Sequence, residues 1–276
     1  MQRINTCLAT LRDHSLAGLL RLACQAAMEG GRILRDLENQ PHDIRQKGLI
    51  DLVTEADIAS EKKILSLFAE QAPDIAILSE ESAADFASAG DAPCWVIDPL
   101  DGTTNFAHSY PWYAVSIACL ERRIPRLGVV YQVPGDHLFL AVRGSGAFLD
   151  GHKISVSSEA NLQQSLLATG FPYNIKEKIG PVGKSLLAVL PNAQGLRRAG
   201  SAALDLAHLA AGHFEGFWET GLKPWDTAAG MLLVEEAGGR LSDFNGKPFD
   251  PFRGEILATN GLIHDALRKL LAGWSS

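Results

Sequence analysis

One short segment constrains this chain more than any other, residues 94–106 with the sequence CWVIDPLDGTTNF. Its first four residues are apolar strand formers and Asp-Pro follows at once, so the pattern predicts a buried strand that leaves the core at Asp98. Asp98 and Asp101 would then project from a rigid edge, and two such hard oxygen donors suit a Mg²⁺ ion. Gly102 and Thr103 could offer backbone amides to a phosphate beside it. A simple turn is the alternative, because Asp, Pro and Gly are typical of type I turns.

Three further segments favour a metal and phosphate site over a turn. They are LSEES at residues 78–82, DLVTEAD at 51–57 and WDTAAGMLLVEEAGG at 225–239. With these segments in place, the chain resembles the inositol monophosphatase family of Mg²⁺-dependent, lithium-sensitive phosphatases, of the bacterial inositol-1-monophosphatase type. The resemblance runs roughly from Lys47 to Gly239 and beyond. It rests on DPxDGTxNF followed far downstream by WDxAAGxxLVxEAGG, a combination that is highly specific.

The resemblance implies a metal centre built from carboxylates and one backbone carbonyl, with two or three Mg²⁺ ions bound. Carboxylates held close together raise one another's pKa when no cation is present, so metal is expected to support local order as well as turnover. Glu80 alone could simply begin a solvated helix, and Asp226 could cap a helix over residues 227–237. The implied ligands are Glu80, Asp98, Asp101 and Asp226, with the carbonyl of Leu100.

The same resemblance implies a catalytic group. Asp57 would hydrogen-bond the Thr103 hydroxyl, and this pair would orient a metal-activated water for in-line attack on phosphorus, with no covalent enzyme intermediate. Asp57 also has a plainer reading, as the acidic partner in a capping box opened by Thr54. Lys47 reads most simply as a solvated lysine. The implied catalytic residues are Asp57, Glu80, Asp101 and Thr103.

The expected substrate is a small phosphomonoester, most simply inositol monophosphate. Amides of Gly102 and Thr103 would hold the phosphate, and Glu219 matches a family position that hydrogen-bonds inositol hydroxyls. Glu219 could instead be an ordinary loop acid paired with Lys223. Relatives with the same metal motifs act on 3'-phosphoadenosine 5'-phosphate, fructose 1,6-bisphosphate or histidinol phosphate, so these substrates stay open. The implied substrate contacts are Asp101, Gly102, Thr103, Gly200, Ser201, Ala202, Glu219 and Asp226.

A different class of function is also open, because some bacterial relatives serve as accessory factors of RNA polymerase complexes. Association with nucleic acid or RNA polymerase is not indicated by the sequence itself, since 25 basic residues against 32 acidic ones give a net charge of −7. The acidic balance is compatible with an anionic substrate because bound metal ions would neutralise several acids. By resemblance, the protein is expected to form a homodimer.

Cysteine spacing and hydropathy indicate the compartment. The four cysteines lie far apart without a CxxC pair, so neither a disulfide framework nor a zinc site is expected. Charged residues interrupt the apolar N-terminal region, and no run of about 18 apolar residues occurs that could cross a membrane. A cytoplasmic protein without membrane attachment is therefore predicted.

Hydrophobic periodicity predicts an α+β fold in two halves, 1–153 and 154–276. The first half should place helices over an antiparallel sheet, with one long or kinked helix over 8–37 and a second helix opened by the capping box at Thr54. The apolar residues of that second helix, Ile58, Ile64, Leu65 and Phe68, fall on one side. Strands are expected at 75–78, 94–97, 114–120, 127–131 and 137–142. The second half should alternate short strands and helices. Resemblance implies a layered α/β/α/β/α sandwich with the active site between the halves.

Two features that could suggest other chemistry carry less weight. Gly144-Ser145-Gly146 lacks the third glycine of a nucleotide-binding loop and is more typical of a tight β-hairpin. The eight histidines show no HExxH pattern, so zinc catalysis is not expected, and His208 and His213 belong most simply to an ordinary helix and its end.

Overall fold

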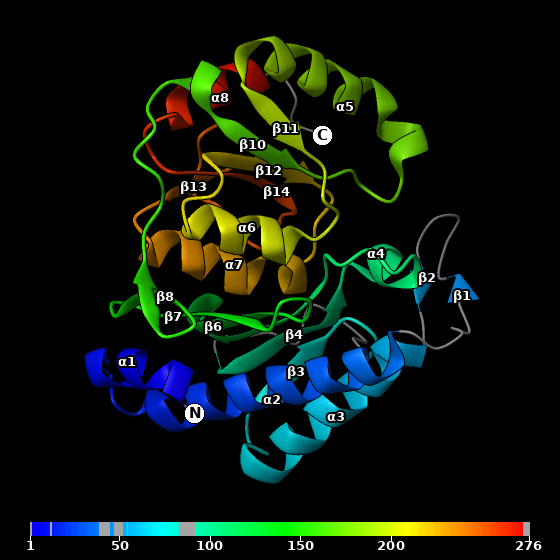
Figure 1. The fold of residues 1–276 in the computed structure, drawn as a ribbon, viewed down its shortest axis with the longest axis vertical. Coiled ribbons are helices and arrows are strands. Elements are labelled where there is room, and N and C mark those ends of the chain that lie inside the picture. Colours follow the sequence, from blue (N-terminus) through cyan, green and yellow to red (C-terminus); the bar gives the residue numbers. More distant parts are fainter. Residues whose placement is uncertain are drawn as a thin grey trace.

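The computed structural model describes residues 2–11, 13–38, 45–46, 52–53, 55–82 and 92–272 of the chain. The fold is an α+β sandwich of five layers, in which helices and sheets alternate (Figure 1). One outer layer contains α1, α2 and α3, and the other contains α5 and α8, with α6 and α7 between the two sheets. Thr54 and Lys47 lie outside the described residues, so the capping box and the solvated lysine stay predictions.

The larger sheet has seven strands in the order β3-β4-β5-β6-β7-β8-β9. Its strands pair antiparallel except for the parallel pair β3 and β4, so the expected antiparallel sheet is present with one parallel edge. The turn at Gly144-Ser145-Gly146 joins β7 to β8 as a hairpin, as expected. The strands are β3 (Ala76–Ser79), β4 (Cys94–Asp101), β5 (Ala114–Glu121), β6 (Ile124–Gln132), β7 (His137–Val142), β8 (Gly146–Leu149) and β9 (His152–Ile154).

The first 37 residues differ from the sequence prediction. They form two helices, α1 (Gln2–Thr10) and α2 (Leu16–Leu37), instead of one. The break falls before Ser15, whose backbone amide donates to Oδ1 of Asp13 at 3.0 Å and so stops the chain from continuing as helix. Gly30 and Gly31 lie inside α2 and do not bend it. They let neighbouring elements approach closely, because a Cβ on Gly30 would lie 2.8 Å from a side-chain carbon of Ile64.

Helix α3 (Glu55–Gln71) lies in the same layer as α2 and contacts both α2 and strand β4. Ile64 and Phe68 are fully buried, as the helical spacing predicts, and Phe68 stacks on Trp95 with ring centroids 4.4 Å apart. Ile58 was expected on the same buried side, but it is 49% exposed. It lies in the first turn of the helix, where Ala56 and Asp57 are the buried residues instead.

The middle layer consists of α6 (Ala202–Ala210) and α7 (Pro224–Glu236). Helix α7 lies directly on the larger sheet, because Gly128 of β6 has no side chain at the crossing point. A Cβ there would approach the backbone of Ala229 to 2.9 Å. The other faces of α6 and α7 pack on the smaller sheet. The helices are therefore buried on both sides, which explains why they are apolar almost all round.

The smaller sheet has five strands in the order β11-β10-β12-β14-β13. Strands β11, β10 and β12 are parallel, whereas β14 runs antiparallel to both of its neighbours. Helices α5 (Ile175–Val189) and α8 (His264–Leu271) contact each other on its outer face (Figure 1). The strands are β10 (Leu166–Thr169), β11 (Gly195–Arg197), β12 (Gly216–Thr220), β13 (Arg240–Ser242) and β14 (Glu255–Thr259).

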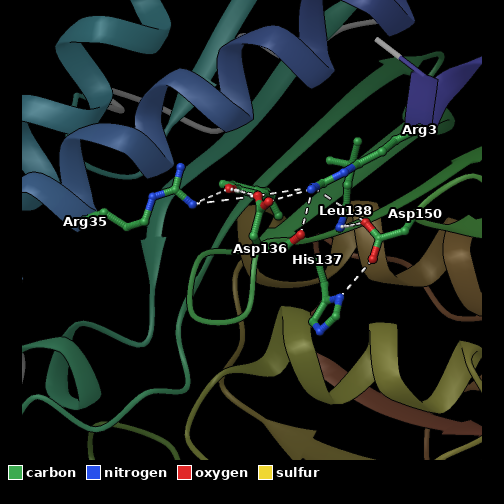
Figure 2. A network of polar contacts seen from close by, with 7 residues as sticks. Arg3, Arg35, Asp136, His137, Leu138 and Asp150 are labelled. Atoms are coloured by element: carbon green, nitrogen blue, oxygen red, sulfur yellow. Dashed lines mark hydrogen bonds and ion pairs between the residues drawn. The ribbon is translucent and has the colours of Figure 1, made fainter.

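A polar network fastens the N-terminal helices to the turns of the larger sheet (Figure 2). Arg3 of α1 donates to the backbone carbonyl of Asp136 at 2.7 Å and forms an ion pair with its carboxylate. Arg35 of α2 donates to the hydroxyl of Tyr131, which donates in turn to Asp136. Asp150, in the next hairpin, binds the ring of His137 at 2.9 Å. Helices α1 and α2 are therefore joined through one turn residue.

The described residues also include several short elements and four cysteines. Helix α4 (Thr103–Ala107) follows β4 directly, and a two-stranded ladder pairs β1 (Arg45–Gln46) with β2 (Leu52–Val53). Short 3₁₀ segments cover Leu162–Gln164 and Leu190–Asn192. All four cysteines are free and buried. Within the described ranges, none of the helices combines the length and hydrophobicity that a bilayer span would require.

Candidate active site

Asp98 and Asp101 both lie within β4, because the strand continues past the point where the sequence pattern ends it. The pairing with β5 is irregular here: Asp98 faces Ser116 and Asp101 faces Ala114, so the ladder shifts between them. Such a bulge redirects side chains without ending the sheet. Asp98 is buried, and its Oδ1 accepts the backbone amide of Leu100 at 3.0 Å. Both carboxylates are thus fixed by the rigid sheet instead of by a loop.

Thr103 begins helix α4 immediately after the bulge. Its hydroxyl lies 3.0 Å from Oδ1 of Asp57 and 3.2 Å from the carbonyl oxygen of Leu100. Asp57 comes from the first turn of α3 and is buried, so the contact joins two separate elements. The hydrogen bond expected from the resemblance is therefore present. Gly102 precedes it with a positive φ of 104°, a backbone conformation that favours glycine.

Asp101 connects the larger sheet to the start of α6. Its Oδ2 accepts the hydroxyl of Ser201 at 2.6 Å and the amide of Ala203 at 2.7 Å. Asn105 makes a second connection, because its side-chain amide donates to the carbonyls of Trp112 at 2.7 Å and Ala199 at 2.9 Å. The 200–202 turn is therefore held against the residues that follow β4.

Asp226 lies in the first turn of α7, but it is not the N-cap. The helix begins at Pro224, earlier than predicted, and Oδ2 of Asp226 accepts the backbone amide of Lys223 at 2.7 Å. Asp226 therefore does take part in capping, but from inside the first turn of the helix and not as the N-cap residue. This contact occupies one of its carboxylate oxygens. Glu80 directly follows β3, where its amide donates to the carbonyl of Ile97 at 3.1 Å. Because β3 and β4 pair in parallel with Ser79 opposite Ile97, Glu80 follows β3 at the level of Asp98 in β4.

The carboxylates are close enough to influence one another's ionisation. Burial, followed by repulsion from Glu80 and Asp101, raises the pKa of both Asp98 and Asp226 well above the usual range. Burial also raises the pKa of Asp101 to about 6, although the hydrogen bonds from Ser201 and Ala203 oppose this shift. Four acids from three different regions of the sequence therefore influence one another's ionisation.

This donor set fits a hard divalent cation, because oxygen ligands and an excess of negative charge are what such ions select. Within the described residues, no three His, Cys, Asp or Glu side chains stand close enough to form a ready-made metal-binding group. Like charges that repel one another are expected to stay apart in this way. The ligand roles of Glu80, Asp98, Leu100, Asp101 and Asp226 stay predictions.

One pocket brings together all the residues that were expected to contact substrate. Its wall combines the end of β4, the 200–202 turn, the end of β12 and the start of α7. The expected residues on its lining are Asp101, Gly102, Thr103, Gly200, Ser201, Ala202, Glu219 and Asp226. Asp57 and Leu100 do not line the pocket, but both lie within hydrogen-bond distance of the Thr103 hydroxyl, which does. Asp98 and Glu80 do not line it either, and Asp98 interacts electrostatically with Asp101 and Asp226 of the lining.

Glu219 lies at the end of β12, facing the pocket. Burial raises its pKa to about 8, while Arg198 acts in the opposite direction. Its carboxylate packs directly over Gly170, where a Cβ would clash with all the carboxylate atoms. Glu219 therefore belongs to a strand and lines the pocket, whereas the alternative placed it in an ordinary loop beside Lys223.

Sequence reasoning missed several residues of the pocket. Gly170, Phe171 and Arg198 line it, and Arg198 lies over the ring of Phe171 at 5.2 Å from the centroid. Asp205 of α6 lines it as well and is 1% exposed. Only Asp205 carried a signal, as a single acid in the otherwise apolar stretch AALDLAHLA.

Comparison with known proteins agrees with this fold. The model of the Inositol monophosphatase family matches residues 15–273. An inositol-1-monophosphatase from Synechocystis sp. is 44% identical over 254 residues, covering 92% of this chain and 88% of that protein. The chain therefore belongs to the inositol monophosphatase family and is a phosphatase of that family, which is generally metal-dependent.

Other relatives have different names. The Nus factor SuhB of Escherichia coli K12 is 41% identical over 255 residues, covering 90% of this chain and 94% of that protein. The crystal structure of the extragenic suppressor protein suhB from Bartonella henselae superimposes with a TM-score of 0.86 at 40% identity, covering 92% of this chain and 98% of that one. The fold expected from the resemblance is therefore confirmed.

Proposed function

We propose that this protein hydrolyses a small phosphomonoester in a Mg²⁺-dependent reaction, and that inositol monophosphate is its substrate. The observation that carries the proposal is the single pocket shared by the residues expected to bind phosphate and those expected to bind an alcohol. Family membership and the Synechocystis relative support the assignment. The reaction releases inorganic phosphate and the free alcohol.

Glu80, Asp98, Asp101 and Asp226, with the carbonyl of Leu100, would hold two or three ions. When bound, Mg²⁺ supplies positive charge to the phosphate and lowers the pKa of a coordinated water. The bulge in β4 contributes by fixing Asp98 and Asp101 on the sheet. Their preorganised negative field favours cation binding at a defined place.

Thr103 and Asp57 position the nucleophile. The Thr103 hydroxyl hydrogen points to Asp57, so the oxygen keeps lone pairs that can accept a hydrogen bond from the attacking water. That contact would direct the water toward phosphorus, opposite the ester oxygen that leaves. The amides of Gly102 and Thr103 would bind phosphate oxygens as the ester bond breaks.

The alcohol portion would lie against the 200–202 turn and Glu219. Glu219 lines the same pocket as Thr103 and would offer carboxyl oxygens to hydroxyl groups of the alcohol. The metal and phosphate residues recognise only the phosphoryl group, so this end decides the substrate. It is also the part in which phosphatases for 3'-phosphoadenosine 5'-phosphate, fructose 1,6-bisphosphate or histidinol phosphate would differ.

The test is phosphate release by purified protein, with and without Mg²⁺, beside the variant Asp101→Asn. We expect Mg²⁺-dependent turnover that the variant loses. A panel of phosphomonoesters then ranks substrates by kcat/KM. A tenfold preference for adenosine bisphosphate, about 1.4 kcal/mol of transition-state energy, would remove the inositol assignment while leaving a phosphatase.

A second candidate function is regulation through the transcription machinery, favoured by the 41% identity to a protein named Nus factor SuhB. Equal background rates from wild type and Asp101→Asn would support this binding role over catalysis. Co-purification of both proteins with RNA polymerase would then be the direct measurement. Catalysis and binding can also coexist, in which case Asp101→Asn separates them.

We also propose a homodimer and inhibition by lithium, both from family membership. The outward face of α5 exposes Ile179 and Leu187, at 63% and 75%, which suits a protein contact. Sedimentation velocity tests the dimer, and a single monomeric species would contradict it. Turnover that is unaffected by lithium at millimolar concentrations would contradict the inhibition.

A further inference from the structure

Asp205 is a buried acid that the proposed chemistry does not use. It lies in the middle of α6, among residues that pack on α7 and on both sheets, and its side chain is 1% exposed. Its Oδ1 is buried and has no hydrogen-bond partner among the described residues. A buried carboxyl oxygen normally accepts at least one hydrogen bond, because burial without one is costly. This orphaned oxygen therefore requires a physical reason.

The surroundings of Asp205 do not supply the missing partner. Burial, followed by the neighbouring acids Glu219 and Asp101, raises the pKa of Asp205 well above the usual range, so none of them offers a stabilising partner. Arg198 is the nearby cation, but its guanidinium lies over the ring of Phe171 and leaves Oδ1 of Asp205 unpaired. The chain thus maintains a buried acceptor beside two other acids, which would be unfavourable if the residue served folding alone.

The position of Asp205 indicates what could bind it. It lines the same pocket as Thr103 and Glu219 and lies on α6 just beyond Ser201. A ligand whose phosphate meets Gly102 and Thr103 would extend its alcohol portion toward Glu219 and Asp205. The group that satisfies a carboxyl acceptor there is a hydrogen-bond donor, and a hydroxyl on the alcohol portion of the proposed substrate supplies one.

We propose that Asp205 is a specificity-determining residue whose carboxyl accepts a hydrogen bond from a hydroxyl group of the substrate's alcohol portion, remote from the phosphate. This inference rests on the proposed function and narrows it to monophosphates of polyhydroxylated alcohols. In this arrangement Asp205 would lie away from the phosphate, so it should affect the choice of substrate and not hydrolysis as such.

The experiment compares two substrates on Asp205→Leu and Asp205→Asn. Leucine has the same branching at Cγ but no polar atom, and asparagine has a similar volume and keeps a carbonyl acceptor. Inositol 1-phosphate carries the hydroxyls, whereas p-nitrophenyl phosphate has none beyond its phosphate. We expect Asp205→Leu to lose at least about tenfold in kcat/KM on inositol 1-phosphate, mainly through KM, and to stay within about twofold on p-nitrophenyl phosphate. Asp205→Asn should retain part of the activity.

A matched control is Glu215→Gln. Glu215 is also a buried acid, but it accepts the amide of Leu166 and lies outside the pocket lining. Its substitution should leave the ratio between the two substrates unchanged. Equal losses on both substrates with Asp205→Leu, or no loss on either, would overturn the proposal and make Asp205 a structural residue.

Stability gives an independent readout. If Asp205 is kept for binding, removing its unpaired oxygen should leave the melting temperature of Asp205→Leu equal to or above that of the wild type. A marked fall would indicate a structural role. If the wild type hydrolyses neither substrate, the proposed phosphatase function fails separately. Calorimetric binding of free inositol then decides for Asp205: weaker binding by Asp205→Leu alone supports the proposal, and equal binding overturns it.

Discussion

The hydroxyl of Thr103 donates a hydrogen bond of 3.0 Å to Oδ1 of Asp57, joining the helix after β4 to the first turn of α3. Asp57 is almost fully buried, so the carboxylate has little freedom to move. Donation to Asp57 fixes the direction of the hydroxyl hydrogen and leaves lone pairs on the oxygen that can accept a hydrogen bond. We propose that Thr103 acts as such an acceptor for the attacking water.

Thr103→Val should therefore abolish most turnover while the fold persists. Valine keeps the shape but has no oxygen to orient water, so kcat should fall by roughly 10²–10³-fold with little change in KM. Thr103→Ser, which restores the hydroxyl, is the matched control and should recover much of the rate. Steady-state kinetics on inositol 1-phosphate provide the measurement. Equal rates for Val and wild type would remove the proposed role.

Gly170→Ala should impair substrate selection. A Cβ at Gly170 would clash with the carboxylate of Glu219, so that side chain must rotate away from its place in the pocket. We expect KM for inositol 1-phosphate to rise by about tenfold, with p-nitrophenyl phosphate almost unaffected. Gly180→Ala offers a control, because nothing lies within 4 Å of its Cβ position. Unchanged KM in Gly170→Ala would show that Glu219 does not contact the alcohol.

Much of the larger sheet could be predicted from the sequence, because long apolar runs identify strands without further context. The predicted strands 114–120 and 137–142 correspond to Ala114–Glu121 and His137–Val142. The break before Ser15 was missed, since helical spacing continues across it and only a local side-chain contact interrupts the helix. Strand β11 is three residues long and has no periodicity to detect.

The site divides in the same way. The motifs identified the pocket residues because the family resemblance assigns them position by position. Periodicity cannot do this, since it does not show which distant segments meet in the fold. What they could not show is the bulge in β4, which depends on pairing with β5, or the unpaired oxygen of Asp205, which depends on tertiary packing. The start of α7 was misplaced by three residues because Asp226 has the chemistry of an N-cap but serves Lys223 from inside the first turn.

Mg²⁺ should stabilise the folded protein in a pH-dependent manner. The pKa of Asp101 is raised by burial to about 6, and those of Asp98 and Asp226 are also raised, so the folded state holds protons that the unfolded state has released. Without metal, these groups therefore destabilise the fold progressively as the pH rises from about 4 through 6. Metal binding requires the deprotonated carboxylates.

The rise in melting temperature on adding Mg²⁺ should accordingly be large at about pH 7.5 and small at about pH 5. Differential scanning fluorimetry in chelator and in excess Mg²⁺ measures it. Asp101→Asn should reduce the gain, whereas Asp265→Asn, at an exposed ion pair with Arg240, should retain it. A gain of equal size at both pH values would contradict proton competition at these carboxylates.

His264 should make the protein sensitive to acid independently of the active site. Its ring lies between the hydroxyls of Ser242 at 3.0 Å and Thr259 at 2.9 Å, and burial lowers its pKa to about 4. Because the unfolded imidazole has a pKa near 6.5, the stabilisation is complete above about pH 6.5 and is lost as the pH falls through 4. Its upper bound is about 3 kcal/mol.

Urea unfolding at about pH 7 and pH 5 should show this loss, and His264→Phe should have a shallower dependence on pH across that range. His137→Gln provides a control. Because this ring is exposed, the substitution should change the pH dependence of the free energy of unfolding only slightly. If the two histidine variants lose stability in parallel with the wild type, buried His264 is not the acid-sensitive group.

Asp136→Ala should loosen the N-terminal helix without affecting catalysis. Asp136 accepts hydrogen bonds from both Arg3 and Tyr131 (Figure 2). The hydrogen bond from Arg3 lowers the pKa of Asp136 to about 2. The ion pair between Arg3 and Asp136 should therefore persist until the pH falls toward that value. Half of the Asp136 side chain is exposed, which limits the expected cost to about 1 kcal/mol. Hydrogen exchange in α1 should accelerate. Arg32→Ala, at an exposed pair within α2, is the control, and equal protection of α1 in all three proteins would show that packing alone holds the helix.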